Sequence, residues 1–440
     1  MKDGAYSTDK PPGNDWSESL PTNWKFKKLK YLSQIDSSGV WGEDPVEGTS
    51  ECRVVTTANI DMQGNIHTEE ITVRSLSKEE LELGSCIPGD IIVVKSSGSA
   101  TNIVSGKAGL VKDEHLPICF SNFTLRVRPT PGVLDAHFAW HFLNSEVVRA
   151  QIRLMVATTT YPNLQVEEYV SFLLPVPNYE DQRTIANYLD LETARLDGLL
   201  ATKERQLELL AEKERMLITQ AVTCGLDQNV PVRDSGIEWL PKIPTHWETD
   251  RAKWLFRERD ERSESGAEEL LSVSHLTGVT PRSEKDVNMF EAETTEGYKI
   301  CRPGDLVINT LWAWMGAMGV SPVHGIVSPA YNVYVPGERL DPGYVDALVR
   351  IRSFAEEATR FSKGVWSSRL RLYPEGFFEI WIPIPPLDEQ RAIITFIASE
   401  TAKLEALRGA AERTIGLLKE RRAALIAAVV TGQMDVVSAT

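Results

Sequence analysis

Polar loops that could contact nucleic acid are conspicuous in this chain because acidic residues are missing from them. Acids make up 62 of the 440 residues, about one in seven, so a long window without any is informative. The acid-free windows 91–112 and 147–166 contain the strings "KSSGSATN" and "TTTYPN". The windows 306–337 and 358–374 occupy matching places later in the chain, and the last one contains "SKGVWSSRLR". Lysine and arginine suit phosphates, asparagine and hydroxyl side chains suit phosphates or base edges, and small residues allow close approach.

We therefore predict that side chains of these windows contact DNA. A single loop of this kind is usually an ordinary solvated turn, but matched positions in two halves of a chain favour binding. For Trp312 and Trp314 core packing is favoured over base contact, whereas Trp366 is balanced between the two. The candidate residues are Lys95, Ser96, Ser97, Ser99, Asn102, Lys107, Thr159, Thr160, Tyr161, Asn163, Asn309, Trp312, Lys363, Trp366, Ser367, Ser368, Arg369 and Arg371.

Catalytic constellations are not found in the sequence. It has no GxxxxGK[ST] phosphate loop, no HExxH or similar histidine pairing, and no lysine preceded by an acid at the two-residue spacing of common nucleases. A glycine-rich cofactor loop and an Asn/Asp-Pro-Pro-aromatic turn, which adenine methyl transfer requires, are also missing. The string "DEQR" at 388–391 resembles a helicase box only in its letters, because Asp388 is better explained as an N-cap or first-turn acid of a helix. The sequence predicts no catalytic residue, no metal site and no directly bound cofactor.

The chain contains the same pattern twice. "GNDWSESLPTNW" (13–24) matches "GIEWLPKIPTHW" (236–247), "IPGDIIV" (87–93) matches "RPGDLVI" (302–308), and "LPVPNYEDQRTI" (174–185) matches "IPIPPLDEQRAI" (382–393). The offset shrinks from 223 to 215 to 208, which indicates small deletions in the second copy. Trp24 and Trp247 mark the entry to each copy. Short β-rich runs between glycines and prolines predict a mixed α/β globule in each, followed by a proline hinge and a long helix.

Apolar residues in each long helix follow steps of three and four, or sums of these steps, which is typical of a coiled-coil seam. About 40 residues give a helix on the order of 60 Å long, which cannot bury its own apolar stripe. Two equal helices in one chain are most simply buried against each other, in antiparallel pairing if each globule lies near the start of its own helix. Lys203 and Glu214 interrupt the first seam. The predicted seam residues are Ile185, Leu189, Leu196, Leu199, Leu207, Leu210, Leu217 and Ala221, and then Ile393, Ile397, Leu404, Leu407, Ala411, Ile415, Leu418, Leu425 and Val429.

The bulk composition limits the classes of protein. The 47 basic and 62 acidic residues give a net charge of −15, which on its own disfavours a polyanionic partner, so binding to DNA would have to be local. The five cysteines are odd in number and widely spaced, which argues against a disulfide framework or a zinc ribbon. The amino terminus lacks a signal-peptide pattern, and the most apolar run is interrupted by polar residues. We expect a soluble cytoplasmic protein.

The combination of these motifs resembles one family. Two variable domains, each introduced by "IPTHW" or a similar string and closed by "IPIPPLDEQRAI" or "VPNYEDQRTI", are followed by helices ending in "AVVTGQMD" and "AVTCGLD". The whole pattern, from about residue 13 to residue 435, closely resembles the specificity subunit of type I restriction-modification systems.

This resemblance implies a division of labour between subunits. Each globule would be a target recognition domain for one half of a bipartite double-stranded DNA target, and the helices would fix the unread spacer and dock two methyltransferase subunits. Those partners would bind S-adenosylmethionine and transfer the methyl group. Restriction and translocase subunits would supply ATP- and Mg-dependent translocation and cleavage.

The resemblance and the repeat together predict an α/β (mixed) fold: two recognition domains in an internal repeat, separated by two long antiparallel coiled-coil helices. The expected boundaries are an N-terminal segment at 1–19, a first recognition domain at 20–177, a central helix at 178–227, a linker at 228–242, a second recognition domain at 243–385 and a C-terminal helix at 386–435. Two alternatives remain open at this point: a scaffold without DNA recognition, and a methyltransferase whose motifs escape detection.

Overall fold

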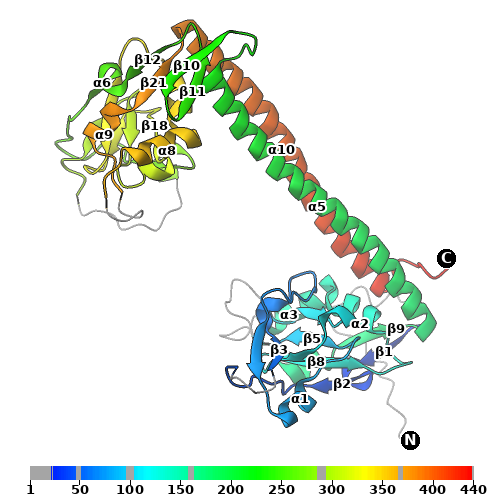
Figure 1. Ribbon diagram of the computed structural model, residues 1–440. Helices are drawn as coiled ribbons and strands as arrows, with labels where there is room; N and C mark the ends of the chain where they lie inside the picture. The colour runs from blue at the N-terminus through cyan, green and yellow to red at the C-terminus, as the bar shows by residue number, and fades with distance from the viewer. Residues whose placement is uncertain are drawn as a thin grey trace, which may run out of the picture. The chain divides into compact units, whose positions relative to one another are not determined.

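The chain forms two units, each containing one mixed α/β domain. The computed structural model describes residues 21, 23–45, 51–95, 104–156, 163–284, 294–364 and 370–438. Unit 1 is Met1–Lys203 with Arg413–Thr440, and unit 2 is Glu204–Glu412. Two long helices, α5 (Tyr179–Cys224) and α10 (Leu387–Val430), contribute to both units (Figure 1).

The domain of unit 1 is built on an antiparallel sheet with strand order β2-β8-β5-β6. A second sheet has the order β4-β3-β7, in which β3 and β7 are parallel, and β1 pairs separately with β9. The strands are β1 (Lys25–Lys28), β2 (Ser33–Asp36), β3 (Glu51–Val55), β4 (Thr72–Ser75), β5 (Ile91–Val94), β6 (Ala108–Leu110), β7 (Ile118–Phe120), β8 (Thr124–Pro129) and β9 (Leu173–Val176). The helices are α1 (Lys78–Gly84), α2 (Ala136–Leu143), α3 (Glu146–Val156) and α4 (Val166–Tyr169), with the short 3-10 turns η2 (Leu29–Tyr31), η3 (Thr57–Asn59) and η4 (Asp113–His115).

The domain of unit 2 is built on a sheet with the order β13-β20-β17-β18, and β12 pairs with β21. Two hairpins, β10-β11 and β14-β15, and the pair β16-β19, whose strands are separated in the chain by β17 and β18, complete it. The strands are β10 (Val232–Ile237), β11 (Leu240–Pro244), β12 (Glu248–Arg251), β13 (Phe256–Glu258), β14 (Leu271–Ser274), β15 (Gly278–Pro281), β16 (Lys299–Cys301), β17 (Leu306–Ile308), β18 (Met318–Val320), β19 (Gly325–Val327), β20 (Asn332–Pro336) and β21 (Trp381–Ile384). The helices are α6 (Ala252–Leu255), α7 (Pro342–Val349), α8 (Arg352–Arg360) and α9 (Pro374–Glu379), with 3-10 turns η5 (Arg282–Glu284) and η6 (Ala313–Met315).

The two domains share one topology, so the mixed α/β repeat expected from the sequence is confirmed. In each, the entry strand pairs antiparallel with the strand of the proline hinge: Lys25 lies opposite Val176 in unit 1, and Glu248 lies opposite Ile384 in unit 2. In each, the strand after the Pro-Gly-Asp turn lies between two antiparallel neighbours, as β5 does in unit 1 and β17 in unit 2. An aspartate N-cap begins the equivalent helices α2 and α7. The side chain of Asp135 accepts a hydrogen bond from the backbone N–H of Phe138 at 3.0 Å, and that of Asp341 accepts one from the N–H of Gly343 at 2.9 Å.

Within each unit, parts of α5 and α10 pack against each other with opposite chain directions. In unit 1, Leu189 near the start of α5 belongs to the same buried cluster as Val429 at the end of α10. In unit 2, Val222 at the end of α5 shares a buried cluster with Ile393 at the start of α10. A bidentate ion pair also joins Asp197 to Arg422 in unit 1, with N–O distances of 2.9 and 3.2 Å. The expected antiparallel pairing of the two long helices is therefore confirmed within each unit.

The predicted helix seam holds at most positions but is wrong at two. Buried positions include Ile185, Leu196, Ala221, Leu404 and Ala411. Leu199 and Leu407, which are equivalent in the two copies, are instead exposed by 46% and 52%. A strict three-and-four step drifts away from the period of a straight helix, which has 3.6 residues per turn. In α5 the buried face of the helix therefore includes Thr193, which is 5% exposed, and does not include Leu199.

Glycine ends both long helices. Gly225 follows α5 with φ of 77°, and Gly432 comes shortly after α10 with φ of 70°. This left-handed conformation favours glycine, and it stops the helix. A Cβ added to Gly432 would also lie 2.5 Å from Pro21. The glycines in "TCGLD" and "VTGQMD" are thus explained by chain geometry. In the described residues, no helix is both long and apolar enough to span a membrane.

Candidate nucleic-acid interface

Seven of the predicted DNA-contacting residues lie in the described part of the chain. They are Lys95, Lys107, Asn163, Asn309, Trp312, Lys363 and Arg371. The other candidates lie outside the described residues: Ser96, Ser97, Ser99, Asn102, Thr159, Thr160, Tyr161, Trp366, Ser367, Ser368 and Arg369.

In unit 1 the two acid-free windows meet. The backbone N–H of Leu164 donates to the carbonyl of Lys95 at 2.7 Å, which places the exposed Asn163 beside the end of β5. The guanidinium of Arg149 on α3 donates to the carbonyl of Ser105 at 2.9 Å, which forms a second link between the windows. Residues 44 and 69 positions apart in the sequence therefore lie at one place on the domain.

The two lysines of this region are anchored to backbone carbonyls. Nζ of Lys95 donates to the Ser37 carbonyl at 2.6 Å, and Nζ of Lys107 donates to the Ile60 carbonyl at 3.1 Å. Partial burial lowers the pKa of both ammonium groups, because desolvation penalises the charged form. Each ammonium has three donors, so one bond to a carbonyl still leaves capacity for a phosphate.

In unit 2 the corresponding windows also meet. Lys363 and Arg371 are paired by backbone hydrogen bonds of 2.9 and 3.0 Å, and both side chains are exposed. The N–H of Leu372, next to Arg371, donates to the Thr310 carbonyl at 3.2 Å, which joins the second window to the loop after β17. Both domains thus bring the same two windows together, and the sequence could not show this because it depends on tertiary packing.

Trp312 is not part of the core, so the packing interpretation favoured for it is wrong. Its side chain is 51% exposed and stacks on the half-buried Trp314, with ring centroids 6.1 Å apart and planes inclined by 21°. Nε1 of Trp314 donates to the Leu311 carbonyl at 3.1 Å, which fixes the ring beneath. The neighbouring Met315 is 37% exposed. This loop presents a rigid, uncharged and flat surface.

Asn309 serves as a support of that loop and is poorly placed to contact DNA. It is only 5% exposed, and its amide donates to the hydroxyl of Tyr331 at 2.9 Å. Its Oδ1 accepts from the N–H of Leu311 at 3.3 Å, at the start of the loop that carries Trp312. Since the side chain is buried and used within the domain, we correct its predicted role from a DNA contact to a structural one.

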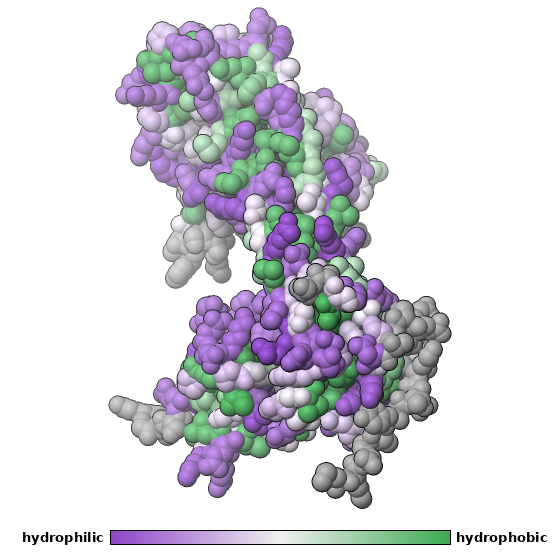
Figure 2. Space-filling view, turned by 90° about the vertical axis from the view of Figure 1, so that its right-hand side faces the viewer, coloured by the Kyte–Doolittle hydropathy of each residue, from purple (hydrophilic) through white to green (hydrophobic). Residues whose placement is uncertain are grey.

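The long helices expose apolar residues at equivalent positions in the two units. In unit 2 a hollow of about 440 Å³ opens between the end of α5 and Phe396 on α10. Around it, Leu209, Met216 and Phe396 are exposed by 49%, 65% and 39%. In unit 1, Leu417 corresponds to Leu209 and is 65% exposed, and Met434 beyond the helix is 42% exposed. Figure 2 shows hydrophobic residues between hydrophilic ones on the visible face of both units.

Metal chemistry is not indicated in the described residues: no group of three or more His, Cys, Asp or Glu side chains there is placed to hold an ion. The interface described above contains hydrogen-bond donors, cationic groups and one aromatic surface. These groups can bind a polyanion and distinguish base edges, but they do not form a nucleophile with a general base.

Comparisons with known proteins agree with this picture. No family model matches the chain. A curated relative, the specificity subunit of the type I restriction enzyme StySPI from Salmonella potsdam, is 26% identical over 189 residues, which are 42% of this chain. The match spans only 39% of that relative's length.

Solved structures have the same fold. A chain from a study of complex assembly and conformational transition in the type I R-M system superposes with a TM-score of 0.70 at 16% identity, covering 94% of this chain and 100% of the other. The HsdS subunit from Thermoanaerobacter tengcongensis superposes with a TM-score of 0.54 at 17% identity, covering 94% of this chain and 98% of that one. The resemblance indicated by the sequence motifs is therefore confirmed: part of the chain is similar in sequence to a type I specificity subunit, and the chain has the fold of the HsdS subunit.

Proposed function

We propose that this chain, as a homologue of type I restriction specificity subunits, is the non-catalytic DNA-specificity subunit of a type I restriction-modification complex in the cytoplasm. Each recognition domain binds one half of a bipartite double-stranded DNA target, and the helices set the length of the spacer. The observation that carries the proposal is the duplication. Two domains of one topology each bring a matched pair of acid-free loops together and each lead directly into a long helix.

The loops carry local positive charge, which can bind DNA despite the negative net charge of the chain. Lys95, Lys107 and Lys363 suit phosphate contacts, which add affinity independent of sequence and weaken as salt rises. Arg371, at the exposed base of the "SKGVWSSRLR" segment, can donate two hydrogen bonds to a guanine edge. The hydroxyl, amide and aromatic candidates at 96–102, 159–161 and 366–369 complete the proposed interface.

The helices provide the proposed docking sites for two methyltransferase subunits. Exposed apolar side chains are enriched at protein interfaces, and here they occur twice at equivalent places, around Leu209 in unit 2 and around Leu417 in unit 1. Two equivalent sites suit two copies of one partner. In this proposal the methyltransferase subunits bind S-adenosylmethionine, and restriction subunits bind ATP and Mg.

Reconstitution tests the proposal directly. The full chain is mixed with candidate methyltransferase subunits and S-adenosylmethionine on genomic DNA, and the methylated adenines are mapped by sequencing. We expect pairs of marks at one bipartite sequence with one spacer, and no marks when either component is left out. Methyl transfer by the chain alone would favour the enzyme alternative. Marks that do not depend on the chain, or no DNA binding by the complex, would favour the scaffold alternative.

A further inference from the structure

Two buried glutamines begin the long helices in the same way. Gln182 lies in "EDQR" in the first turn of α5, and Gln390 lies in "DEQR" in the first turn of α10. The side chains are 1% and 0% exposed, although glutamine is usually a surface residue. A buried amide is tolerated when its donors and acceptor are satisfied, so their partners indicate what these residues do.

In unit 1, Gln182 makes three hydrogen bonds that join two segments of chain to α5. Its Oε1 accepts from the backbone N–H of Asp135 at 2.8 Å, and Asp135 is itself the N-cap of α2. Its Nε2 donates to the carbonyl of Val133 at 3.1 Å, just before that cap. The same nitrogen donates to the carbonyl of Pro177 in the hinge at 3.0 Å. One amide therefore connects the start of α2, the hinge and the long helix.

In unit 2, Gln390 makes the equivalent three bonds. Oε1 accepts from the N–H of Asp341, the N-cap of α7, at 2.7 Å. Nε2 donates to the carbonyl of Arg339 at 2.9 Å and to that of Pro385 in the second hinge at 2.8 Å. The two domains have diverged in their loops, yet both retain this connection between domain and helix.

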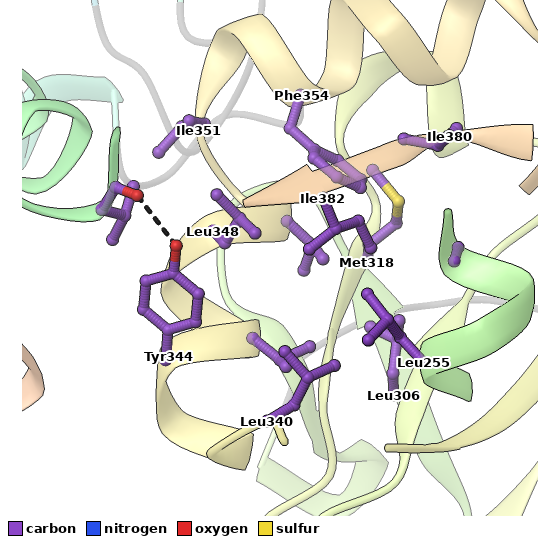
Figure 3. Close-up of a cluster of buried hydrophobic side chains, with 14 of the residues drawn as sticks. Leu255, Leu306, Met318, Leu340, Tyr344, Leu348, Ile351, Phe354, Ile380 and Ile382 are labelled. Carbon is purple, nitrogen blue, oxygen red and sulfur yellow. Dashed lines mark hydrogen bonds between the residues drawn. The ribbon is translucent and has the colours of Figure 1, made fainter. Parts of the chain in front are cut away.

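Unit 2 adds a further connection that unit 1 lacks. The hydroxyl of the buried Tyr344 on α7 donates to the carbonyl of Val222 at the end of α5, at 3.0 Å (Figure 3). It also lies 3.4 Å from the carbonyl of Pro383. At the equivalent place unit 1 has Phe138, which is buried but has no hydroxyl. The glutamine is thus the polar connection common to both domains.

These hydrogen bonds restrict the orientation of each domain on its long helix. Apolar packing between a helix and a domain tolerates small sliding and tilting, whereas hydrogen bonds require donors and acceptors to be aligned. Three bonds from one planar amide, two to the segment that caps the domain helix and one to the hinge, leave little freedom for the domain to pivot at the proline hinge. Loss of the amide leaves buried backbone groups without partners, which favours rearrangement at this point.

We propose that Gln182 and Gln390 are positioning residues that fix each recognition domain on its helix and so make the complex strict for one spacer length. This inference rests on the proposed function, because spacer length has a meaning only for a bipartite target. It assigns half-site recognition to the loops and spacer strictness to the glutamines. Changing a glutamine should therefore alter which spacers are accepted without altering the bases that are recognised.

The test measures methylation by the assembled methyltransferase complex on a DNA library with fixed half-sites and spacers of varied length. Gln182→Met and Gln390→Met retain the length of the side chain but remove its hydrogen bonds. We measure the ratio of methylation at spacers one base pair shorter or longer to methylation at the native spacer. We expect this ratio to rise about tenfold, which corresponds in free energy to the loss of about one hydrogen bond. The double variant should relax further.

Controls separate positioning from stability and from the proposed function itself. Arg183→Met changes the exposed neighbour of Gln182, and its spacer profile should match that of the unchanged chain. Circular dichroism identifies variants that fail to fold, and Gln390→Asn, which retains the amide but shortens the side chain, then serves as the second variant. Folded variants with lower overall activity but the native spacer profile overturn the inference. A failure of the unchanged complex to mark a bipartite site with one spacer rejects the proposed function instead.

Discussion

Asp190 on α5 accepts a hydrogen bond from Nε2 of the buried His141 on α2, at 2.7 Å. Its other carboxylate oxygen lies 2.7 Å from Nδ1 of His137, one turn earlier on the same helix. Burial alone would raise the pKa of Asp190, but the bonds from the two histidines outweigh burial and hold that pKa well below its usual range. The equivalent residues of unit 2 are Gly343, Ala347 and Ala398, so this polar cluster occurs in one domain only.

The cluster predicts a pH optimum for the stability of unit 1. The hydrogen bond to Asp190 raises the pKa of His137, so the stability that it contributes is complete below its unfolded value near 6.5 and is lost as pH rises through the folded pKa. Desolvation lowers the pKa of His141, so stability is lost as pH falls below 6.5, because the unfolded chain binds the proton more readily. Asp190 adds a further loss at lower pH, as its carboxylate is protonated. Asp135, Lys112 and Arg422 also face the histidines and modify these pKa values.

Hydrogen exchange by mass spectrometry, corrected for the intrinsic rate at each pH, measures this prediction. Protection of α2 should be greatest near pH 6.5 and fall on both sides. His141→Gln should flatten the change between pH 5 and about 6.5, and His137→Gln the change above about 6.5. Peptides from α7, which lacks the cluster, are the internal control. Equal pH dependence of α2 and α7, or no change in either variant, would contradict the assignment.

The sequence was sufficient for features that are encoded locally or by repetition. Proline hinges and apolar periodicity predicted α5 and α10, because these signals depend on residues close to one another in the sequence. The repeated motifs predicted the duplicated domain. The sequence was insufficient where tertiary packing decides. Leu199 and Leu407 satisfy the heptad pattern but face solvent, and Trp312 is apolar but exposed.

The glutamines show the converse case, in which polar residues are buried by tertiary packing that the sequence does not predict. A polar residue in a first helical turn is normally explained as solvated, so burial of Gln182 and Gln390 was not predicted. The available signal was that glutamine follows an acid and precedes arginine at the start of both helices. Among the candidate site residues, the meeting of Asn163 with Lys95 also depends on contacts that no sequence window contains.

Trp312 is expected to contact a thymine methyl group in the half-site of the second domain. Its exposed ring is rigid and uncharged, and apolar contact with that methyl is one way of distinguishing thymine in the major groove. Trp312→Ala should weaken binding to the cognate target about threefold to tenfold, the effect of losing burial of roughly a methyl group or slightly more. Replacing the contacted thymine by uracil, which lacks the methyl, should have a similar effect on the unchanged complex.

A double-mutant cycle tests this contact. Trp312→Ala should bind the thymine and uracil targets equally, and Trp312→Phe should recover part of the preference. Trp254→Ala is the matched control, since Trp254 on α6 is 72% exposed but lies outside the acid-free windows. A half-site without thymine on either strand, or equal losses for both bases in the variant and the unchanged chain, would rule the contact out.

Leu209 and Leu417 are expected to control the number of methyltransferase subunits. Leu209→Glu and Leu417→Glu each place a charge on one of the two equivalent apolar surfaces, and burial of that charge should weaken docking by about 2 kcal/mol or more, roughly thirtyfold. Native mass spectrometry should show complexes with two methyltransferase copies for the unchanged chain, one for each single variant and none for the double variant.

The control for docking is Leu154→Glu. Leu154 on α3 is 74% exposed but does not belong to the long helices, so this variant should retain two copies. If both Leu209→Glu and Leu417→Glu also retain two copies, the partner docks elsewhere. If a single variant loses both copies at once, the two sites are not independent.

The last prediction concerns the length of the long helices. We expect that four helical residues inserted both after Lys203 in α5 and after Glu412 in α10 will lengthen the spacer by about two base pairs, because four residues add about 6 Å and one base pair rises about 3.4 Å. Four residues rotate the helix by about 400°, only about 40° more than one full turn, so most of the helical phase is retained. An insertion of two residues in each helix is the control. It rotates the following segment by about 200°, and methylation of bipartite sites should be lost.

Sequencing of methylated DNA decides the outcome. The half-site bases should not change, since they are recognised by loops that the insertion does not touch. An unchanged spacer in a folded, active variant would show that the helices do not set this distance, and changed half-site bases would show that recognition and spacing are not separate.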